Sequence, residues 1–496
     1  MVNDLIFKTP EELGLSSNFV LEFIKRIREW KINLHSFMLV KDGAIMAEGY
    51  YKPFDKDFEH RLYSTSKTFV AMAVGLLCDE GKIRLTDCIA DYFPEYRDTQ
   101  QHKWLQECTI EDALKMSVPQ PIDTYYERQT DRWAWTFFNV GKAVKPAGTI
   151  FQYNTSGTFI LDVLVEKLTG KTFLQYLQPV LDEIGVSRDI WCVEAPDGYS
   201  WGGSGVVATL RDFAKFGEFI LNKGLVNGKQ LISREYMEKA TSKQICNLYE
   251  NNYSIRTTTG YGSQIWITDE GYSLYGMGSQ YVFCFPKKNF MFVCQGDTQC
   301  SADSAGDIIY DAVKRLLYEN IQDKALPSNE AASKELSERL ASLELNAEFG
   351  DKHSDFEKVI NGQVYRLEAN PMSWKWFKFD FDGDNGVLTY ENPRGVKQIK
   401  FSFGSYTVGT FPETHYYDKR VDTPAGRELD CMMSAGWTEH KKLLLRVYIT
   451  DINIGNCFMN FAFKGEQGEE VGLLFMKRAE FFMDGYQGFA GGYKDV

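Results

Sequence analysis

The sequence lacks the patterns that mark several large classes of protein. It has no run of roughly 18 or more apolar residues, so no membrane-spanning helix is expected. Its start, MVNDLIFKTPEELGLSS, has no basic stretch followed by a long apolar run, which argues against a cleaved signal peptide. The six histidines form no HExxH motif and the cysteines form no CxxC pair, so the sequence predicts no metal site.

An excess of positive charge is also missing. The formal net charge is −13, whereas binding to nucleic acid or to an anionic membrane needs a basic surface. The ten cysteines are scattered, which is typical of thiols in a reducing compartment. We therefore expect a cytoplasmic protein with no nucleic-acid partner, no membrane partner and no cofactor. The sequence does not determine the oligomeric state, and a homo-oligomer is one of the options.

Apolar and aromatic residues, by contrast, are abundant. They make up 44% and 15% of the 496 residues, enough for a large core. At roughly 150 residues per domain, this length indicates two or three domains. A charged, polar stretch at 321–350 separates two regions of different pattern. We interpret these as a domain over residues 1–320, a linker over 321–350 and a second domain over 351–496.

The first region alternates between strand and helix patterns. Residues 17–30 have helical spacing after a serine cap, and two strand-like runs flank Lys41-Asp42-Gly43, a strong hairpin signal. A second hairpin turns at residues 286–289, and residues 110–225 look mainly helical. If the strands at both ends pair in one sheet, the fold is α/β (α+β): an antiparallel sheet flanked by helices, with an inserted all-helical subdomain.

The C-terminal region has the period-two pattern of β-strands. About six to eight such runs indicate a small β-barrel or a sandwich. The stretch DFDGDNGVLTYE spaces its acids like a calcium loop, but Gly386 at the seventh position and strand-like flanks favour a hairpin turn. The aromatic residues Trp374, Trp376, Phe377 and Phe381 either form the core or line a ligand cavity, and the core is favoured.

Ser64-Thr65-Ser66-Lys67 is the stretch that most suggests chemistry. It opens an apolar helix, where free backbone N–H groups and the positive end of the helix dipole lie. Ser64 and Lys67 are about one helical turn apart, within reach for proton transfer. The plain alternative is a serine cap followed by a solvated lysine, and spacing alone does not exclude it.

Several ordered blocks resemble the serine β-lactamase and penicillin-binding-protein superfamily, in particular its class C and esterase branch. YSTSKTFVAMAVGLL resembles the S-x-S-K helix, PAGTIFQYNTSGTFILDVLVEKLTG the Y-x-N block, and GGSGVVATLRDFAKFGEFILNKG a later family segment. The similarity covers roughly residues 8–320. It implies that Ser64 is the acylated nucleophile, that Lys67 accepts its proton, and that Tyr153 relays a proton to the leaving group.

Two positions depart from the family pattern. Thr155 stands where Y-x-N has asparagine. The third motif, a K-T-G or H-x-G triplet on a strand edge, matches Met277-Gly278-Ser279, or a register one residue earlier that begins at Gly276. No lysine or histidine stands there to bind a substrate carboxylate, and the thioether of Met277 cannot take over that role.

The backbone part of the predicted site survives these substitutions. An oxyanion hole from the N–H group of Ser64 and that of about Ser279 or Gln280 needs no particular side chain. We therefore expect a serine hydrolase that acts on a small-molecule ester or amide, with a β-lactam or D-amino-acid peptide as further options. The alternative is a non-catalytic binding or assembly protein on the same scaffold. The C-terminal domain resembles the lipocalin-like domains of some superfamily members.

Overall fold

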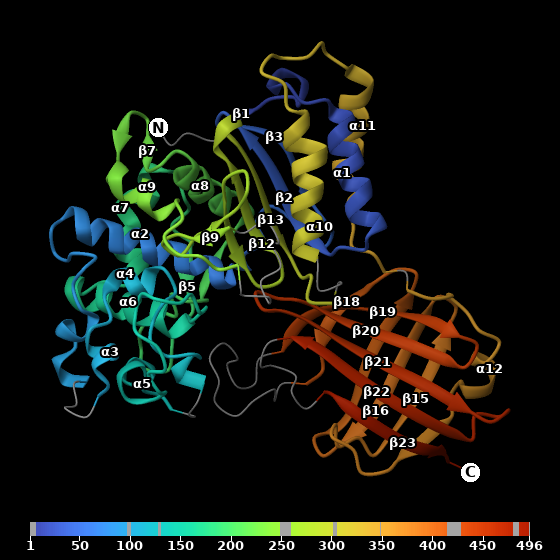
Figure 1. The fold of residues 1–496 in the computed structure, drawn as a ribbon. Helices are drawn as coiled ribbons and strands as arrows, with labels where there is room; N and C mark the ends of the chain where they lie inside the picture. The colour runs from blue at the N-terminus through green and yellow to red at the C-terminus, as the bar shows by residue number, and fades with distance from the viewer. Residues whose placement is uncertain are drawn as a thin grey trace. The chain divides into compact units, whose positions relative to one another are not determined.

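Two compact units make up the chain in the computed structural model, Met1–Glu344 and Leu345–Val496 (Figure 1). The structure describes residues 6–96, 101–126, 130–248, 259–300, 305–347, 349–413, 428–479 and 486–495. The division between the units falls inside the predicted linker. Among the helices so described, none is both long and apolar enough to cross a membrane.

An eight-stranded sheet forms the centre of the first unit. Its order is β1-β3-β2-β13-β12-β11-β10-β9, and every pair is antiparallel except β1 with β3. The strands are β1 (Ile6–Phe7), β2 (Leu34–Lys41), β3 (Ala44–Tyr50), β9 (Gly260–Tyr261), β10 (Trp266–Ile267), β11 (Tyr272–Gly276), β12 (Gln280–Phe285) and β13 (Phe290–Gly296). Because β2 pairs with β13, the two predicted hairpins from opposite ends of the unit lie side by side, as expected.

Helices cover both faces of this sheet (Figure 1). On one side lie α1 (Ser17–Glu29), α10 (Ala305–Ala312) and α11 (Glu330–Ala341), and on the other α8 (Leu210–Leu221) packs on β2, β12 and β13. Ser16 caps α1 as the sequence predicts, and its hydroxyl accepts the N–H of Asn18. Although α11 lies within the predicted linker, it packs on α1 and β3 and so belongs to the first unit.

The segment between β3 and β9 contains the helical subdomain. Its helices are α2 (Ser66–Asp79), α3 (Lys103–Gln106), α4 (Ile110–Leu114), α5 (Trp133–Asn139), α6 (Thr155–Thr169), α7 (Phe173–Glu183) and α9 (Arg234–Ala240). A small sheet of β4 (His60–Arg61), β6 (Val206–Ala208) and β5 (Trp191–Cys192) joins it to the chain entering α2. Since α2 packs on both α6 and α7, almost every residue of α2 is buried.

The second unit is a closed β-barrel of nine strands, which resolves the predicted choice between barrel and sandwich. A parallel pairing of β17 with β19 closes the ring, and β18 adds to β19. The strands are β14 (Val364–Leu367), β15 (Trp376–Asp382), β16 (Asn385–Asn392), β17 (Gly395–Phe403), β18 (Thr407–Phe411), β19 (Leu429–Glu439), β20 (Lys442–Thr450), β21 (Ile454–Lys464), β22 (Glu470–Ala479) and β23 (Gly488–Lys494).

Aromatic side chains fill this barrel. Trp374 and Phe377 are buried in its core and Phe381 packs against it, whereas Trp376 donates to the carboxylate of Glu391 at 2.6 Å. The predicted calcium-like stretch forms the tight β15–β16 hairpin, in which Asp382 pairs with Asn385. The prediction of a hairpin turn is therefore confirmed, and that of a core position is confirmed for Trp374, Phe377 and Phe381 but is wrong for Trp376, which is half-buried outside the core.

Candidate active site

The predicted nucleophile lies on a strained turn between β4 and α2. A 3₁₀ turn, Tyr63–Thr65, precedes the helix, and Tyr63 has a φ of 49°, a left-handed conformation that is costly for a bulky residue. The end of β11 holds this turn closely, because a Cβ atom on Gly276 would lie 2.1 Å from the carbonyl oxygen of Leu62. Glycine is thus required where the sheet meets the turn that presents Ser64.

Lys67 lies one helical turn beyond Ser64 and faces it. Its Nζ atom is 3.0 Å from Oγ of Ser64 and donates to the carbonyl oxygen of Gly203 at 2.6 Å. Only 1% of the Lys67 surface is exposed. Burial lowers the pKa of Lys67 to about 7, so a large fraction of the amine is neutral near neutral pH and can accept a proton.

Two charged groups shift the pKa of Lys67 in opposite directions. The negative charge of Asp123 raises the pKa of Lys67, and the positive charge of Arg61 lowers it. Arg61 is fully buried between the rings of Tyr63 and Trp201, 4.6 and 4.5 Å from its guanidinium carbon. It donates to the carbonyl and hydroxyl oxygens of Ser204, at 2.8 and 3.0 Å.

Tyr153 covers the amine from a third direction. The Lys67 Nζ atom lies 5.0 Å from the centre of the Tyr153 ring, and this ring stacks on Trp266 with 5.6 Å between centroids. Asn154, which follows, caps α6 by accepting the N–H of Gly157 at 3.0 Å. The predicted departure from Y-x-N thus has a local reason: the asparagine one place early starts the helix.

Thr155, at the asparagine position of the motif, is engaged by Asp123. The Asp123 carboxylate accepts the N–H of Ser156 at 2.9 Å and hydrogen bonds from the backbone and hydroxyl of Thr155. Burial raises the pKa of Asp123, while these hydrogen bonds and the charge of Lys67 oppose that shift. A carboxylate therefore stands beside the amine in this chain.

The predicted third motif adopts a turn instead of a strand edge. Met277, Gly278 and Ser279 connect β11 to β12, and both Gly278 and Ser279 have left-handed φ values, 79° and 75°. The strand begins again at Gln280, whose carbonyl accepts the Thr65 hydroxyl at 3.3 Å. The structure thereby brings this hairpin to the residue that follows Ser64.

Side chains brace this turn from within. Gln280 is fully buried and donates from Nε2 to the carbonyls of Met277 and Gly296, at 3.1 and 2.7 Å. The Ser279 and Thr298 hydroxyls share a hydrogen bond of 2.7 Å. Both predicted polar residues therefore use their side chains to hold the turn, which leaves the backbone as the part that can meet a substrate.

Sequence reasoning missed three contributors to this site. Arg61, Asp123 and the Gly203 carbonyl surround Lys67 but come from segments far apart in the chain. Arg61 had no distinct signal, because it follows a stretch in which charged residues are common. Asp123 had no sequence signal, because a single acidic residue in a loop forms no motif with its neighbours.

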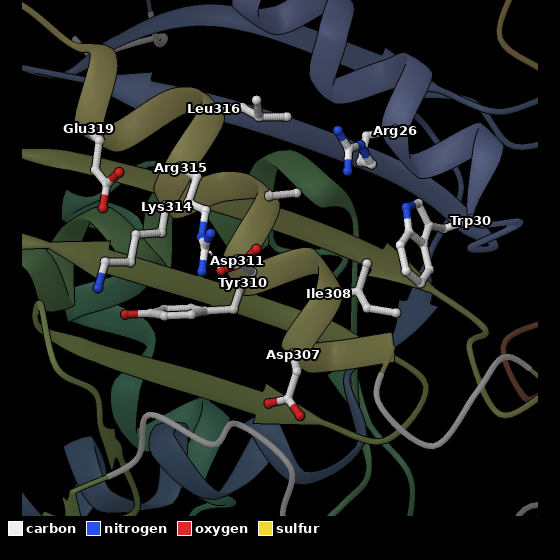
Figure 2. A pocket seen from close by; sticks show the side chains of 11 residues that line it. Arg26, Trp30, Asp307, Ile308, Tyr310, Asp311, Lys314, Arg315, Leu316 and Glu319 are labelled. Atoms are coloured by element: carbon white, nitrogen blue, oxygen red, sulfur yellow. Dashed lines mark ion pairs between the residues drawn. The ribbon is translucent and has the colours of Figure 1, made fainter.

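A separate pocket lies on the other side of the same unit. Figure 2 shows its lining from α1, α10 and the π-helical turn Val313–Leu317, with a volume of about 940 Å³. Its charged groups partly pair with each other, as Arg315 and Asp311 do at 2.6 Å, and Trp30 is 55% exposed. Among the residues that the structure describes, its lining holds no serine, threonine, cysteine or histidine.

Comparison with known proteins places this geometry in context. The family model described as Beta-lactamase matches residues 34–295, more than half of the chain. The 6-aminohexanoate-dimer hydrolase of Paenarthrobacter ureafaciens is 26% identical over 218 residues, which are 41% of this chain and 56% of that protein. Protein flp of Staphylococcus aureus is 23% identical over 157 residues, 29% of this chain and 31% of that protein. The chain thus spans about half, or less, of the length of these curated relatives.

A solved structure shares the fold. A candidate 6-aminohexanoate-dimer hydrolase from Bacillus anthracis superposes with a TM-score of 0.52 and 18% identity, over 66% of this chain and 89% of its own. At this level of identity the match shows a common fold. The matched region of the family model includes Ser64, Lys67, Tyr153 and the β11–β12 turn.

Proposed function

Because the chain belongs to the Beta-lactamase family, we propose that it is a serine hydrolase that forms an acyl-enzyme on Ser64. The observation that carries the proposal is the Ser64–Lys67 pair, 3.0 Å apart, with a buried amine whose pKa is lowered to about 7. A solvated capping lysine, the plain alternative, would be exposed and would keep its ordinary pKa. A non-catalytic scaffold would have no need of a buried amine held against a serine hydroxyl.

The proposed reaction begins with attack of Ser64 Oγ on the substrate carbonyl. The neutral amine of Lys67 takes the hydroxyl proton; burial favours this neutral form, and the positive charge of Arg61 adds to the effect. Backbone N–H groups at Ser64 and at the β11–β12 turn, about Ser279 or Gln280, stabilise the oxyanion. Tyr153, which lies over Lys67, relays the proton to the leaving group, and water then releases the acyl group.

We further propose that the substrate is an uncharged ester or amide. The position that would hold a carboxylate-binding cation carries Met277, and the acid nearest the base is Asp123. Both features disfavour an anionic β-lactam or a peptide carboxylate. The relative named as a 6-aminohexanoate-dimer hydrolase supports a substrate other than a β-lactam.

A cytoplasmic location also stays part of the proposal. Four buried cysteines, Cys108, Cys284, Cys294 and Cys431, are thiols, and burial raises the pKa of Cys284 to about 12. Buried thiols of this kind are typical of proteins in a reducing compartment. A lipocalin-like role for the barrel and homo-oligomer formation remain predictions.

A fluorophosphonate probe tests the proposed function directly. Wild-type protein should be labelled in a time-dependent manner, and Ser64→Ala should not be labelled although it folds. Unlabelled wild-type protein should hydrolyse short p-nitrophenyl esters faster than a cephalosporin. Labelling that persists in Ser64→Ala would overturn the assignment of the nucleophile, and preferred cephalosporin turnover would overturn the substrate class.

A further inference from the structure

Helix α6 carries two acids, one turn apart, that hold a glycine-rich loop. Asp162 is fully buried, and its Oδ2 atom accepts the N–H of Gly202 at 2.9 Å. One turn later, Oε1 of Glu166 accepts the N–H and hydroxyl of Ser200 at 3.1 and 2.7 Å. These contacts fix the loop 200–205 to the helix that begins beside Tyr153.

The same loop holds both cations of the candidate active site. Gly203, the residue after the one that Asp162 binds, directs its carbonyl oxygen to the Lys67 amine at 2.6 Å. Ser204 accepts two hydrogen bonds from Arg61. Asp162 is thus separated from the carbonyl that holds the proposed base by little more than one residue of backbone.

The loop has no room to shift without moving that carbonyl. A Cβ atom on Gly202 would lie 2.5 Å from a methyl group of Val70 and 2.6 Å from Oδ2 of Asp162. A Cβ atom on Gly203 would lie 2.4 Å from the methyl group of Thr155. Only glycine fits at both positions, so α2 and α6 pack directly on the backbone of the loop.

Asp162 is an unusual choice for such a buried position. Its Oδ1 atom has no hydrogen-bond partner in the part of the chain that the structure describes. Burial raises the pKa of Asp162 well above its ordinary value. What its side chain supplies is an acceptor for the buried Gly202 N–H, which an apolar residue would leave unsatisfied.

We propose that Asp162 is a positioning residue, which fixes Gly202 so that the Gly203 carbonyl holds the Lys67 amine against Ser64. This inference rests on the proposed function, because it assigns a supporting group to the same base. Asp162 meets no substrate and moves no proton. It acts through the loop, and its loss should reduce the rate of chemistry and leave substrate binding largely intact.

The test compares Asp162→Ala with Asp162→Asn, which keeps a carbonyl oxygen for the Gly202 N–H. The measurements are the rate constant of fluorophosphonate labelling, the fraction of protein labelled at completion, and kcat and KM for p-nitrophenyl butyrate. Asp162→Ala should lower the labelling rate constant and kcat by about 10–100-fold, with KM within about twofold. Asp162→Asn should stay within about threefold of wild type. Asp162→Ser, whose short hydroxyl cannot replace the carboxyl oxygen, provides a second disrupting variant if the alanine variant fails to fold.

Asp212→Ala is the matched control. Asp212 is also buried and accepts a backbone N–H, that of Ser187 at 2.8 Å, and it takes no part in the loop that holds Lys67. The control should lose thermal stability while its labelling rate constant per site stays at the wild-type value. If Asp162→Ala or Asp162→Ser lowers only the labelled fraction or the melting temperature, the positioning role is wrong. If wild type is not labelled, or Ser64→Ala is, the proposed function itself fails.

Discussion

The pH dependence of the reaction follows from the state of one amine. With a pKa of about 7, half of Lys67 is neutral at pH 7. At the ordinary lysine value of 10.5, only about one molecule in 3,000 would be neutral there, so burial increases the amount of active base by about 10³-fold. Because the neutral form is the base, kcat/KM should rise about tenfold per pH unit on the acid side and level off above pH 7.

The assay measures kcat/KM for a p-nitrophenyl ester between about pH 5 and 9, read at the isosbestic wavelength of the product. The perturbation is Asp123→Asn, which keeps the acceptor for the Ser156 N–H and removes the negative charge that favours the ammonium form. The acid limb should therefore shift to lower pH. Asp189→Asn removes an equal charge from an exposed acid and serves as the control.

Either of two results would refute this reasoning. A profile that rises only toward pH 10 would mean that Lys67 keeps an ordinary pKa and that the buried amine is not the base. A limb that moves to higher pH in Asp123→Asn would mean that the carboxylate acts on some other group.

Further substitutions test other parts of the structure. Lys67→Met should abolish labelling yet stabilise the fold at low pH. Because the pKa of Lys67 falls from 10.5 to about 7 on folding, the unfolded chain binds more protons between these values, and the wild-type free energy of unfolding should rise by about 5 kcal/mol across that pH window. Denaturant unfolding at pH 6 and pH 10 should show that this rise is absent in the variant. Met277→Lys supplies the missing cation and should raise turnover of an anionic cephalosporin relative to a neutral ester by about tenfold or more, in parallel steady-state assays; an unchanged ratio would show that the turn does not face the substrate. Trp374→Ala, which empties a packed site in the barrel core, should cost about 3–5 kcal/mol in unfolding of the second unit, and a cost below about 1 kcal/mol would contradict the packing described.

Periodicity and turn chemistry were sufficient to predict much of the fold. Asp42-Gly43 and residues 286–289 marked two hairpins, and their pairing in one sheet is confirmed by β2 and β13. The family resemblance rested on ordered blocks, and the match of the family model confirms it. These features are local in sequence, so a single chain displays them.

The interior of the site could not be predicted in the same way. Arg61, Asp123 and Asp162 act on Lys67 or on its support only because three separate segments fold onto one another. The strand expected at Met277–Ser279 is a turn in which Ser279 adopts a left-handed φ. A serine gives no sequence signal for that conformation, which is uncommon for residues other than glycine. Burial, the main cause of the lowered pKa of Lys67, is a property of the assembled fold.

The left-handed Tyr63 has a consequence for how this protein can evolve. Glycine at this position would relax a backbone strain of about 1–3 kcal/mol, but it would also empty a fully buried aromatic site at a cost of about 3–5 kcal/mol, so Tyr63→Gly should lower stability. The exchange would also remove one of the two rings that lie against Arg61, whose positive charge helps to lower the pKa of Lys67. Stability and the environment of Arg61 therefore both favour keeping the tyrosine, and the strained backbone persists because the buried ring more than offsets its cost.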